Sequence, residues 1–226
     1  MGAYAKEEHL ACVIARLLEG ARHAAIGASS PIPASGCFLR KVYDPAFRVS
    51  LQQRRAGNPF TEGSRELFDL AGQGRIDTFF LGGAQIDGTA AINLVRADGR
   101  RFPGSFGSAF MYPMVPGTIL FREEHSRRTL VKKVEFASAR GDPRALLTGK
   151  ALFSWQKDKG RFRLESFHDA SLDEIAENTG FEYDLSPRVR ETPPPTEEEI
   201  SLLRTKVSKQ LAADYPDFAK RVWGIN

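Results

Sequence analysis

The segment from Asp77 to Gly83 places the strongest constraint on the fold. It reads Asp-Thr-Phe-Phe-Leu-Gly-Gly, an almost continuous apolar run that ends in two glycines. Such a strand is typical of a sheet that is covered on both faces, because it leaves no alternate polar position for solvent. We therefore expect a buried strand of an α/β sheet here.

Helical and strand patterns alternate along the first half of the chain, and strands dominate the second half. This order predicts an α/β fold: an open, mostly parallel sheet with flanking helices and an added antiparallel part. Helices are expected over 6–22, from Pro31 or Pro33 to before Asp44, and over 64–71 and 171–178, with strands over 23–28, 47–52, 77–83, 90–95, 118–121, 131–136, 151–155 and 161–167.

The domain organisation follows from a change in composition near residue 190. We expect residues 1–190 to form one α/β domain, and residues 191–226 to be a Pro-rich linker and a C-terminal helix that packs on this domain. Three consecutive prolines, Pro193 to Pro195, make a stiff linker. Thr196 and Glu199 then form a capping-box pattern that opens the helix.

Composition and charge exclude several classes of protein. The net charge of +4, from 32 basic and 28 acidic side chains, is mild and scattered, which argues against a nucleic-acid partner. No apolar run reaches the roughly 20 residues of a membrane span. The acidic pair Glu7-Glu8 interrupts the place of a secretory signal. We expect a cytoplasmic protein, with Cys12 and Cys37 as reduced core thiols.

The generic catalytic patterns are absent from the sequence. There is no Gly-x-Gly-x-x-Gly run, Walker loop, Gly-x-Ser-x-Gly elbow, Cys-x-x-Cys pair or His-Glu-x-x-His helix. The four histidines share no metal-ligand spacing, so we expect no metal site. Any activity must come from a less general arrangement of residues.

The turns that follow the strands are the places to seek a site, because open α/β sheets bind ligands at the carboxyl ends of their strands. Gly82 and Gly83 follow the apolar strand and let the backbone approach a ligand closely, and Gln85 can donate and accept hydrogen bonds. The alternative is a tight turn in which glycine supplies a positive φ and Asp87 caps the turn.

A second Gly/Ser turn, residues 104–108, reads Gly-Ser-Phe-Gly-Ser. Its backbone amides are able to form an oxyanion hole for a carbonyl oxygen. The alternative is an ordinary surface loop.

Four segments together carry a resemblance to a known family. In chain order they resemble segments of the β subunits of family I CoA-transferases, such as glutaconate CoA-transferase, over nearly the whole chain. The segments are Val42-Tyr43-Asp44-Pro45, Phe80-Leu81-Gly82-Gly83-Ala84-Gln85-Ile86-Asp87, Arg101-Phe102-Pro103-Gly104-Ser105 and Glu177-Asn178-Thr179-Gly180-Phe181.

The resemblance implies a CoA-transferase-like fold, an α-subunit partner of similar fold and an active site at their interface. In the family a glutamate attacks the acyl-CoA thioester and forms an anhydride, so coenzyme A is a co-substrate and no cofactor is bound. The resemblance also implies substrate and CoA contacts. Gly82, Gly83, Gln85 and Asn93 would shape the pocket floor, and Gly104, Ser105 and Gly107 would supply donors.

The sequence departs from the family at the nucleophile, because the position of the catalytic glutamate is Gln52. An amide is a poor nucleophile and forms no anhydride. One explanation follows the related steroid-ring hydrolases, in which the α subunit supplies the glutamate. This chain would then be the supporting subunit of an acyl-CoA hydrolase or a ring-cleaving enzyme. Alternatively, Glu62 or Glu66 has taken over the role. A third reading, from another class, is a non-catalytic binding protein that retains the fold.

Overall fold

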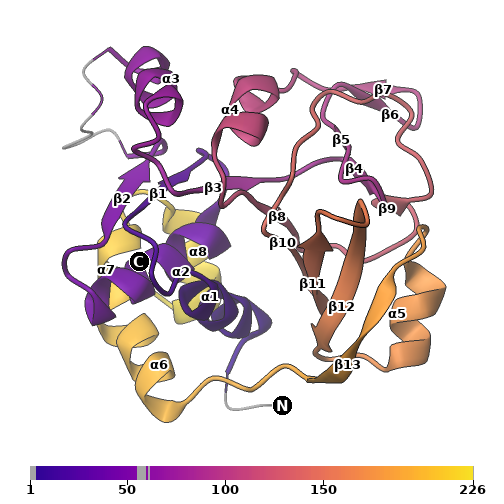
Figure 1. The fold of residues 1–226 in the computed structure, drawn as a ribbon. Coiled ribbons are helices and arrows are strands. Elements are labelled where there is room, and N and C mark those ends of the chain that lie inside the picture. The colour runs from indigo at the N-terminus through magenta and orange to yellow at the C-terminus, as the bar shows by residue number, and fades with distance from the viewer. Residues whose placement is uncertain (1–3, 55–59, 61, 226) are drawn as a thin grey trace. The chain divides into compact units, whose positions relative to one another are not determined.

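The computed structural model describes residues 4–54, 60 and 62–225, which fall into two structural units (Figure 1). The first unit holds the described residues up to Leu67, the short segment Arg75–Thr78 and the segment from Pro193 onward. The second unit holds Phe68–Gly74 and Phe79–Thr192. The chain returns to the first unit close to the place where the sequence changes composition.

The N-terminal part of the first unit alternates helix and strand, as the sequence predicts. The strands β1 and β2 pair in parallel, with His23 opposite Arg48 and Ile26 opposite Leu51. All four residues of β1 are buried. The elements are α1 (Lys6–Leu17), β1 (His23–Ile26), α2 (Pro31–Tyr43) and β2 (Arg48–Leu51).

Helices α1 and α2 pack against each other at a glycine. A Cβ atom built on Gly36 would lie 2.4 Å from Ile14 Cγ2, which is too short for a non-bonded contact. Glycine is therefore needed for the two helices to approach this closely. The buried thiols of Cys12 and Cys37 lie on these two helices.

The C-terminal segment differs from the single helix expected from the sequence. It forms α6 (Glu197–Leu202), a π-helical turn (Leu203–Val207), α7 (Ser208–Leu211) and a separate helix, α8 (Pro216–Trp223). The expected capping box is present, since Thr196 Oγ1 accepts from the Glu199 N–H at 3.1 Å. Three apolar side chains of this segment, Leu203, Val207 and Leu211, are fully buried.

The large sheet of the second unit confirms the predicted α/β class. Its strand order is β13-β12-β11-β10-β8-β3. The pairs β3–β8, β8–β10 and β12–β13 are parallel, and β10–β11 and β11–β12 are antiparallel. The strands are β3 (Thr78–Leu81), β8 (Ile119–Arg122), β10 (Ala145–Thr148), β11 (Ala151–Gln156), β12 (Arg161–Phe167) and β13 (Asp184–Glu191).

The second unit also contains a small three-stranded sheet of order β5-β4-β9, whose strands lie between β3 and β10 in the chain. The prediction of a strand over 131–136 is wrong beyond Val131. In place of pairing with a neighbouring strand, two backbone N–H groups of this stretch donate to side chains: Val134 N donates to Asp87 Oδ2, and Glu135 N donates to Gln85 Oε1. The remaining elements are β4 (Gln85–Asp87), β5 (Ile92–Asn93), β6 (Arg96–Ala97), β7 (Arg100–Arg101), β9 (Leu130–Val131), α3 (Ser64–Gly72), α4 (Ser108–Met114) and α5 (Leu172–Asn178).

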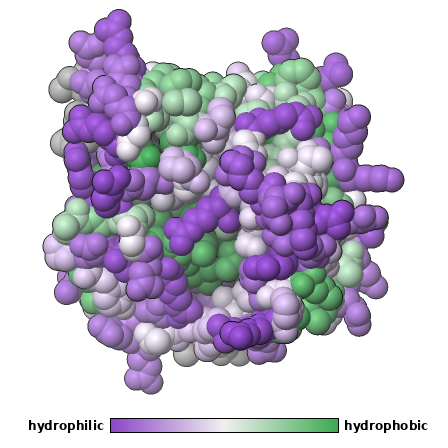
Figure 2. Space-filling model, in the orientation of Figure 1, coloured by the Kyte–Doolittle hydropathy of each residue, from purple (hydrophilic) through white to green (hydrophobic). Residues whose placement is uncertain are grey.

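Hydrophilic residues cover much of the face shown in Figure 2, and apolar residues form separate patches on it. Three exposed apolar side chains lie close together in the sequence, Phe106, Phe110 and Met114. Phe106 and Phe110 each pack against Phe68, with ring centroids 5.7 Å apart. No helix in the described part of the chain is long and apolar enough to cross a membrane.

Candidate functional site

The residues singled out in the sequence divide between the two units. Gln52 lies in the first unit, at the carboxyl end of β2. Its N–H donates to the carbonyl oxygen of Ile26, the last residue of β1, at 3.0 Å. Gln52 therefore sits where two parallel strands end together, which is the usual place for ligands in open α/β sheets.

The Gln52 side chain has an unusual feature at its amide nitrogen. Nε2 is buried and has no hydrogen-bond acceptor. Burying an amide donor without an acceptor costs about 1–3 kcal/mol, so each such group calls for an explanation, and a bound ligand that supplies the acceptor is one. The free donor marks this strand end as a candidate binding position.

Arg54 anchors the turn that carries Gln52. Its Nε and Nη2 both donate to Asp214 Oδ2, at 3.0 and 2.6 Å. Nη2 also donates to the Gln210 carbonyl oxygen, and the guanidinium lies 4.9 Å from the centroid of the Phe38 ring. The turn itself closes with Arg54 N donating to Leu51 O at 3.1 Å.

In the second unit, Gly82 and Gly83 follow β3 and allow a close backbone approach. A Cβ on Gly83 would lie 2.7 Å from the Gln85 carbonyl oxygen, and one on Gly82 would lie 3.1 Å from that of Phe121. Neither glycine has a positive φ. Lack of space, and not a left-handed backbone, therefore selects glycine at this bend.

Gln85 and Asn93 are brought together, and both are buried. Asn93 Nδ2 donates to Gln85 Oε1 at 2.9 Å, and Gln85 Nε2 donates to Glu135 Oε1 at 2.8 Å. Asn93 Oδ1 accepts from the N–H groups of Val95 and Arg96. The two amides thus hold the β4–β5 hairpin in place. If this hairpin forms part of a pocket floor, as predicted, Gln85 and Asn93 would support that floor through these hydrogen bonds.

Glu135 was not anticipated from the sequence, although its carboxylate completes this network. It accepts from Gln85 and from the N–H of Asp98, and these two hydrogen bonds lower the pKa of Glu135. The signal available in the sequence is weak, because an exposed glutamate within a Lys-Lys-Val-Glu-Phe run looks like an ordinary strand residue.

Asp87 caps the turn through Thr89 N at 2.9 Å and Ala91 N at 3.3 Å, as the alternative tight-turn reading expects, although none of Gly82, Gly83 and Gly88 has the positive φ of that reading. The next residue, Gly88, lies directly against Phe181. This contact brings two of the family-like segments next to each other, because Gly88 directly follows the segment 80–87 and Phe181 ends the Glu-Asn-Thr-Gly-Phe run.

The same run is held by a buried histidine. His125 contacts Thr148 Oγ1 through Nδ1 at 2.8 Å and Thr179 Oγ1 through Nε2 at 3.1 Å. Burial lowers the pKa of His125 to about 4, so the ring is neutral at pH 7. Gly180 N donates to the Leu130 carbonyl oxygen at 2.7 Å. These contacts give the run a structural role.

The Gly104–Ser108 turn is exposed at Gly104 and Phe106, whereas Ser108 at its end is buried. Gly104 has a φ of 122° and Phe106 a φ of 48°, with Phe106 67% exposed. A left-handed backbone is uncommon for a bulky residue. Gly107 is confined by the Phe68 ring, which a Cβ would approach to 2.2 Å. Ser105 accepts from Ser108 through its carbonyl oxygen, and no hydrogen bond in the described part of the chain joins it to Gln85 or Asn93.

The two glutamates considered as replacement nucleophiles lie at the start of α3. Glu62 is 61% exposed at its side chain and pairs with Arg65 at 2.8 Å. Glu66 lies in the first turn of α3, where the helix dipole favours an acid. The segment 55–59 before them lies outside the described residues.

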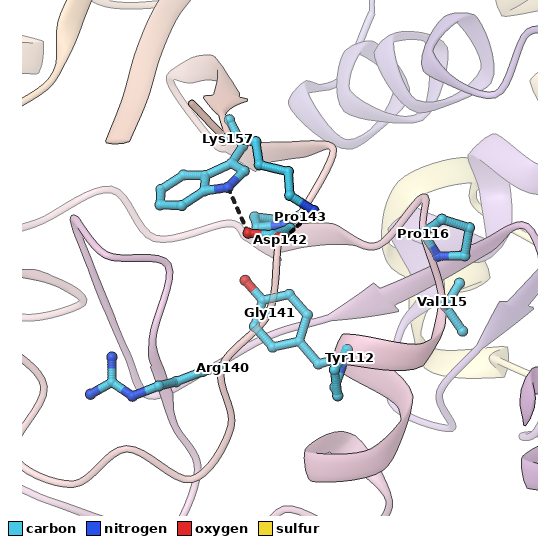
Figure 3. Close-up of a pocket in the computed structure, with 10 residues that line it drawn as sticks. Tyr112, Val115, Pro116, Arg140, Gly141, Asp142, Pro143 and Lys157 are labelled. Carbon is cyan, nitrogen blue, oxygen red and sulfur yellow. Dashed lines mark hydrogen bonds and ion pairs between the residues drawn. The ribbon is translucent and has the colours of Figure 1, made fainter. Parts of the chain in front are cut away.

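A cavity of about 570 Å³ lies elsewhere in the second unit (Figure 3). Val115 and Pro116 precede β8, and Asp142 and Pro143 precede β10, so the cavity lies at the amino ends of these strands. Gly82 and Gly83 follow the carboxyl end of the parallel strand β3. The cavity is therefore separate from the candidate site. In the described part of the chain, no three His, Cys, Asp or Glu side chains form a group suited to a metal ion.

Comparisons with known proteins agree with this geometry. No protein-family profile matches the chain. The B-type subunit of the 3-oxoadipate CoA-transferase of Pseudomonas knackmussii is 25% identical, in an alignment that covers 94% of this chain and 97% of that relative. The chain is a CoA-transferase β-subunit-like protein.

Solved structures support the same fold. Glutaconate coenzyme A-transferase from Acidaminococcus fermentans matches 93% of this chain and 97% of its own, with a TM-score of 0.80 and 21% identity. The decarboxylase AibA/AibB matches 88% and 93%, with a TM-score of 0.79 and 24% identity. The CoA-transferase β-subunit-like fold is thus also found in an enzyme that is named a decarboxylase.

Proposed function

We propose that this chain is the β-type subunit of a two-component enzyme that acts on an acyl-CoA thioester. The partner is an α subunit of the CoA-transferase type, and the attacking carboxylate belongs to that partner. The observation that carries the proposal is Gln52 at the carboxyl end of β2. The CoA-transferases that this chain resembles have their catalytic glutamate at this position. The Pseudomonas knackmussii relative is itself named as one subunit of its enzyme, which supports the assignment as one component of a pair.

The proposed roles of the individual residues follow from their positions. The narrow bend at Gly82 and Gly83, supported by Gln85 and Asn93, shapes the floor of the acyl pocket. Gly104, Ser105 and Gly107 present amide or hydroxyl donors toward the thioester. The small basic surplus of the chain favours an anionic ligand such as CoA, whose phosphates are bound well by Lys and Arg.

The chemistry divides between the two chains. A carboxylate oxygen of the α subunit attacks the thioester carbonyl carbon, a C–O bond forms, and the C–S bond breaks. The acyl group stays on the partner as an anhydride, and the sulfur leaves as the CoA thiolate. In a transferase this thiolate stays bound and attacks the partner's own carbonyl carbon in the anhydride, which releases the first acid and leaves CoA on the partner as a thioester; an acceptor carboxylate then takes over CoA by the same two steps in reverse. In a hydrolase the thiolate takes up a proton and departs, and water cleaves the anhydride.

A second reaction class is kept because the glutamate is replaced. A supporting β subunit without a nucleophile also suits an acyl-CoA hydrolase or a ring-cleaving enzyme, in which no acyl group needs to be stored on this chain. The AibA/AibB decarboxylase, which shares the fold, is named for a reaction other than CoA transfer. A non-catalytic binding protein is the alternative from a different class.

Co-expression with a CoA-transferase α-type chain from the same genome tests the proposal. With an acceptor carboxylate present, we expect the purified pair to consume short-chain, aromatic-derived or steroid acyl-CoA thioesters, either by forming the acceptor's CoA thioester or by releasing CoA, and each chain alone to be inactive. A pair that consumes none of these thioesters and shows no thermal shift with CoA would favour the non-catalytic alternative. Transfer to a second carboxylate, as against release of free acid, separates the transferase from the hydrolase.

A further inference from the structure

We propose that the Gln52 side-chain amide is a substrate-binding donor: its Nε2 donates a hydrogen bond to the carbonyl oxygen of the acyl thioester. This inference rests on the proposed function, and it assigns to Gln52 a role different from the nucleophile that it replaces. Gln52 then contributes to catalysis by polarising the substrate carbonyl through a hydrogen bond, and it forms no covalent bond with the substrate.

Gln52 Nε2 is buried, and no acceptor within the described chain reaches it. A buried donor without an acceptor lowers stability, and a ligand that supplies the acceptor recovers this free energy. An amide N–H requires an oxygen or nitrogen acceptor, which a thioester carbonyl provides.

The turn that carries Gln52 is held in place before any ligand binds. The Gln52 N–H is fixed to Ile26 O at 3.0 Å, and Arg54 two residues later is fixed to Asp214 and Gln210. A donor on a preorganised backbone needs little reorganisation when it binds, which is the condition for strong electrostatic stabilisation of a developing oxyanion.

An amide at position 52 suits the charge that develops during the reaction better than a carboxylate does. When a partner carboxylate attacks the thioester, negative charge develops on the carbonyl oxygen. A glutamate at position 52 would repel this charge, whereas a neutral amide donor stabilises it. The change to Gln52 therefore fits an enzyme whose attacking carboxylate comes from elsewhere.

The test compares two CoA ligands of equal length on the purified two-chain complex. One is the butyryl ketone analogue in which CH2 replaces the thioester sulfur, which keeps the carbonyl and cannot transfer. The other is S-butyl-CoA, a thioether without the carbonyl. We expect the wild-type complex to bind the ketone about 5- to 20-fold more tightly by titration calorimetry, the usual range for one hydrogen bond.

Gln52→Leu should reduce this preference to about one, because the donor is gone. Gln53→Leu is the matched control, since its side chain is exposed on the same turn, and it should keep the preference. Gln52→Asn, whose shorter side chain withdraws the donor, should behave like Gln52→Leu. A Gln52→Leu complex that still prefers the ketone as strongly as the wild type would overturn the inference.

Two further readouts separate the possible failures. If Gln52 had only a structural role, Gln52→Leu would lower the thermal midpoint of the isolated chain; we expect it unchanged or raised, because an unpaired buried donor is removed. A wild-type complex that binds neither ligand contradicts the proposed function. A wild-type complex that binds both ligands equally contradicts only the role assigned to Gln52.

Discussion

Phe181 packs directly against Gly88, and a Cβ atom on Gly88 would lie 2.9 Å from Phe181 Cβ. The contact joins the Gly-Gly-Ala-Gln-Ile-Asp-Gly turn to the Glu-Asn-Thr-Gly-Phe run, which lie far apart in the printed sequence. Two segments that resemble the same family are therefore parts of one packing arrangement.

Gly88→Ala should destabilise the protein, because the added methyl group would lie 2.9 Å from Cβ of the buried Phe181 side chain. We expect a loss of about 1–3 kcal/mol in the free energy of unfolding, the usual cost of overpacking, measured by urea denaturation. Phe181→Leu in the same chain should recover little of the loss, because leucine keeps the Cβ and Cγ atoms that the new methyl group approaches most closely.

The control for this substitution is Gly72→Ala in α3. A Cβ there makes an ordinary 3.7 Å contact with Phe110, and alanine favours helix more than glycine does. We expect no loss of stability. Equal losses for Gly72→Ala and Gly88→Ala would show that the Phe181 contact is not the cause.

His125 should make stability depend on pH in the mildly acidic range. Burial lowers its pKa from 6.5 to about 4 in the folded chain. Between these values the unfolded chain binds a proton that the folded chain does not, so the free energy of unfolding falls as the pH falls. The stabilising contribution of the neutral His125 ring to the free energy of unfolding is complete above pH 6.5, and about 3 kcal/mol of it is lost by pH 4.

His125→Gln isolates this effect, because glutamine does not titrate but can still bond to Thr148 and Thr179. We expect the variant to be less stable than the wild type at pH 7, and the gap between the two to narrow between pH 6.5 and 4. The difference in the free energy of unfolding is measured by chemical denaturation at each pH. A difference that stays constant between pH 6.5 and 4 would contradict a neutral, buried His125.

Arg54 should contribute to stability through its pairing with Asp214, whose side chain is only 9% exposed. Arg54→Ala leaves this carboxylate without its partner, and we expect a loss of about 1–3 kcal/mol. Arg65→Ala, which breaks the exposed pair with Glu62, should have little effect. Similar midpoints of urea unfolding for both variants would contradict an anchoring role for Arg54.

Both cysteine thiols should be unreactive in the folded protein. Burial raises the pKa of Cys12 to about 12 and that of Cys37 well above its usual value, so neither forms a thiolate at pH 8. Ellman's reagent should detect no thiol in the native chain and two after unfolding in guanidinium chloride. Rapid reaction of a native thiol would indicate that the packing of α1 on α2 opens readily.

Much of the fold was predictable because local patterns and tertiary packing agree in the first half of the chain. The helix at Pro31 begins and ends as its prolines indicate, and the strand before it is fully buried. The errors arise where tertiary contacts replace local pairing. Val134 and Glu135 have a strand pattern, yet their N–H groups bind Asp87 and Gln85.

The candidate site was predictable as a set of positions, but not as a set of contacts. The glycines at 82 and 83 were recognised, whereas their role as spacers depends on the Phe121 and Gln85 carbonyl groups. The anchoring of Gln52 through Arg54 depends on Asp214, which lies 160 residues beyond Arg54, and no local pattern connects such a pair.

The most direct test of the central claim asks which chain carries the acyl group. The two-chain complex is incubated with an acyl-CoA thioester that it turns over, treated with borohydride or hydroxylamine, and both chains are weighed by intact mass spectrometry. The account predicts modification of a carboxylate on the α partner and an unchanged mass for this chain. A modified glutamate on this chain, such as Glu62 or Glu66, would contradict it.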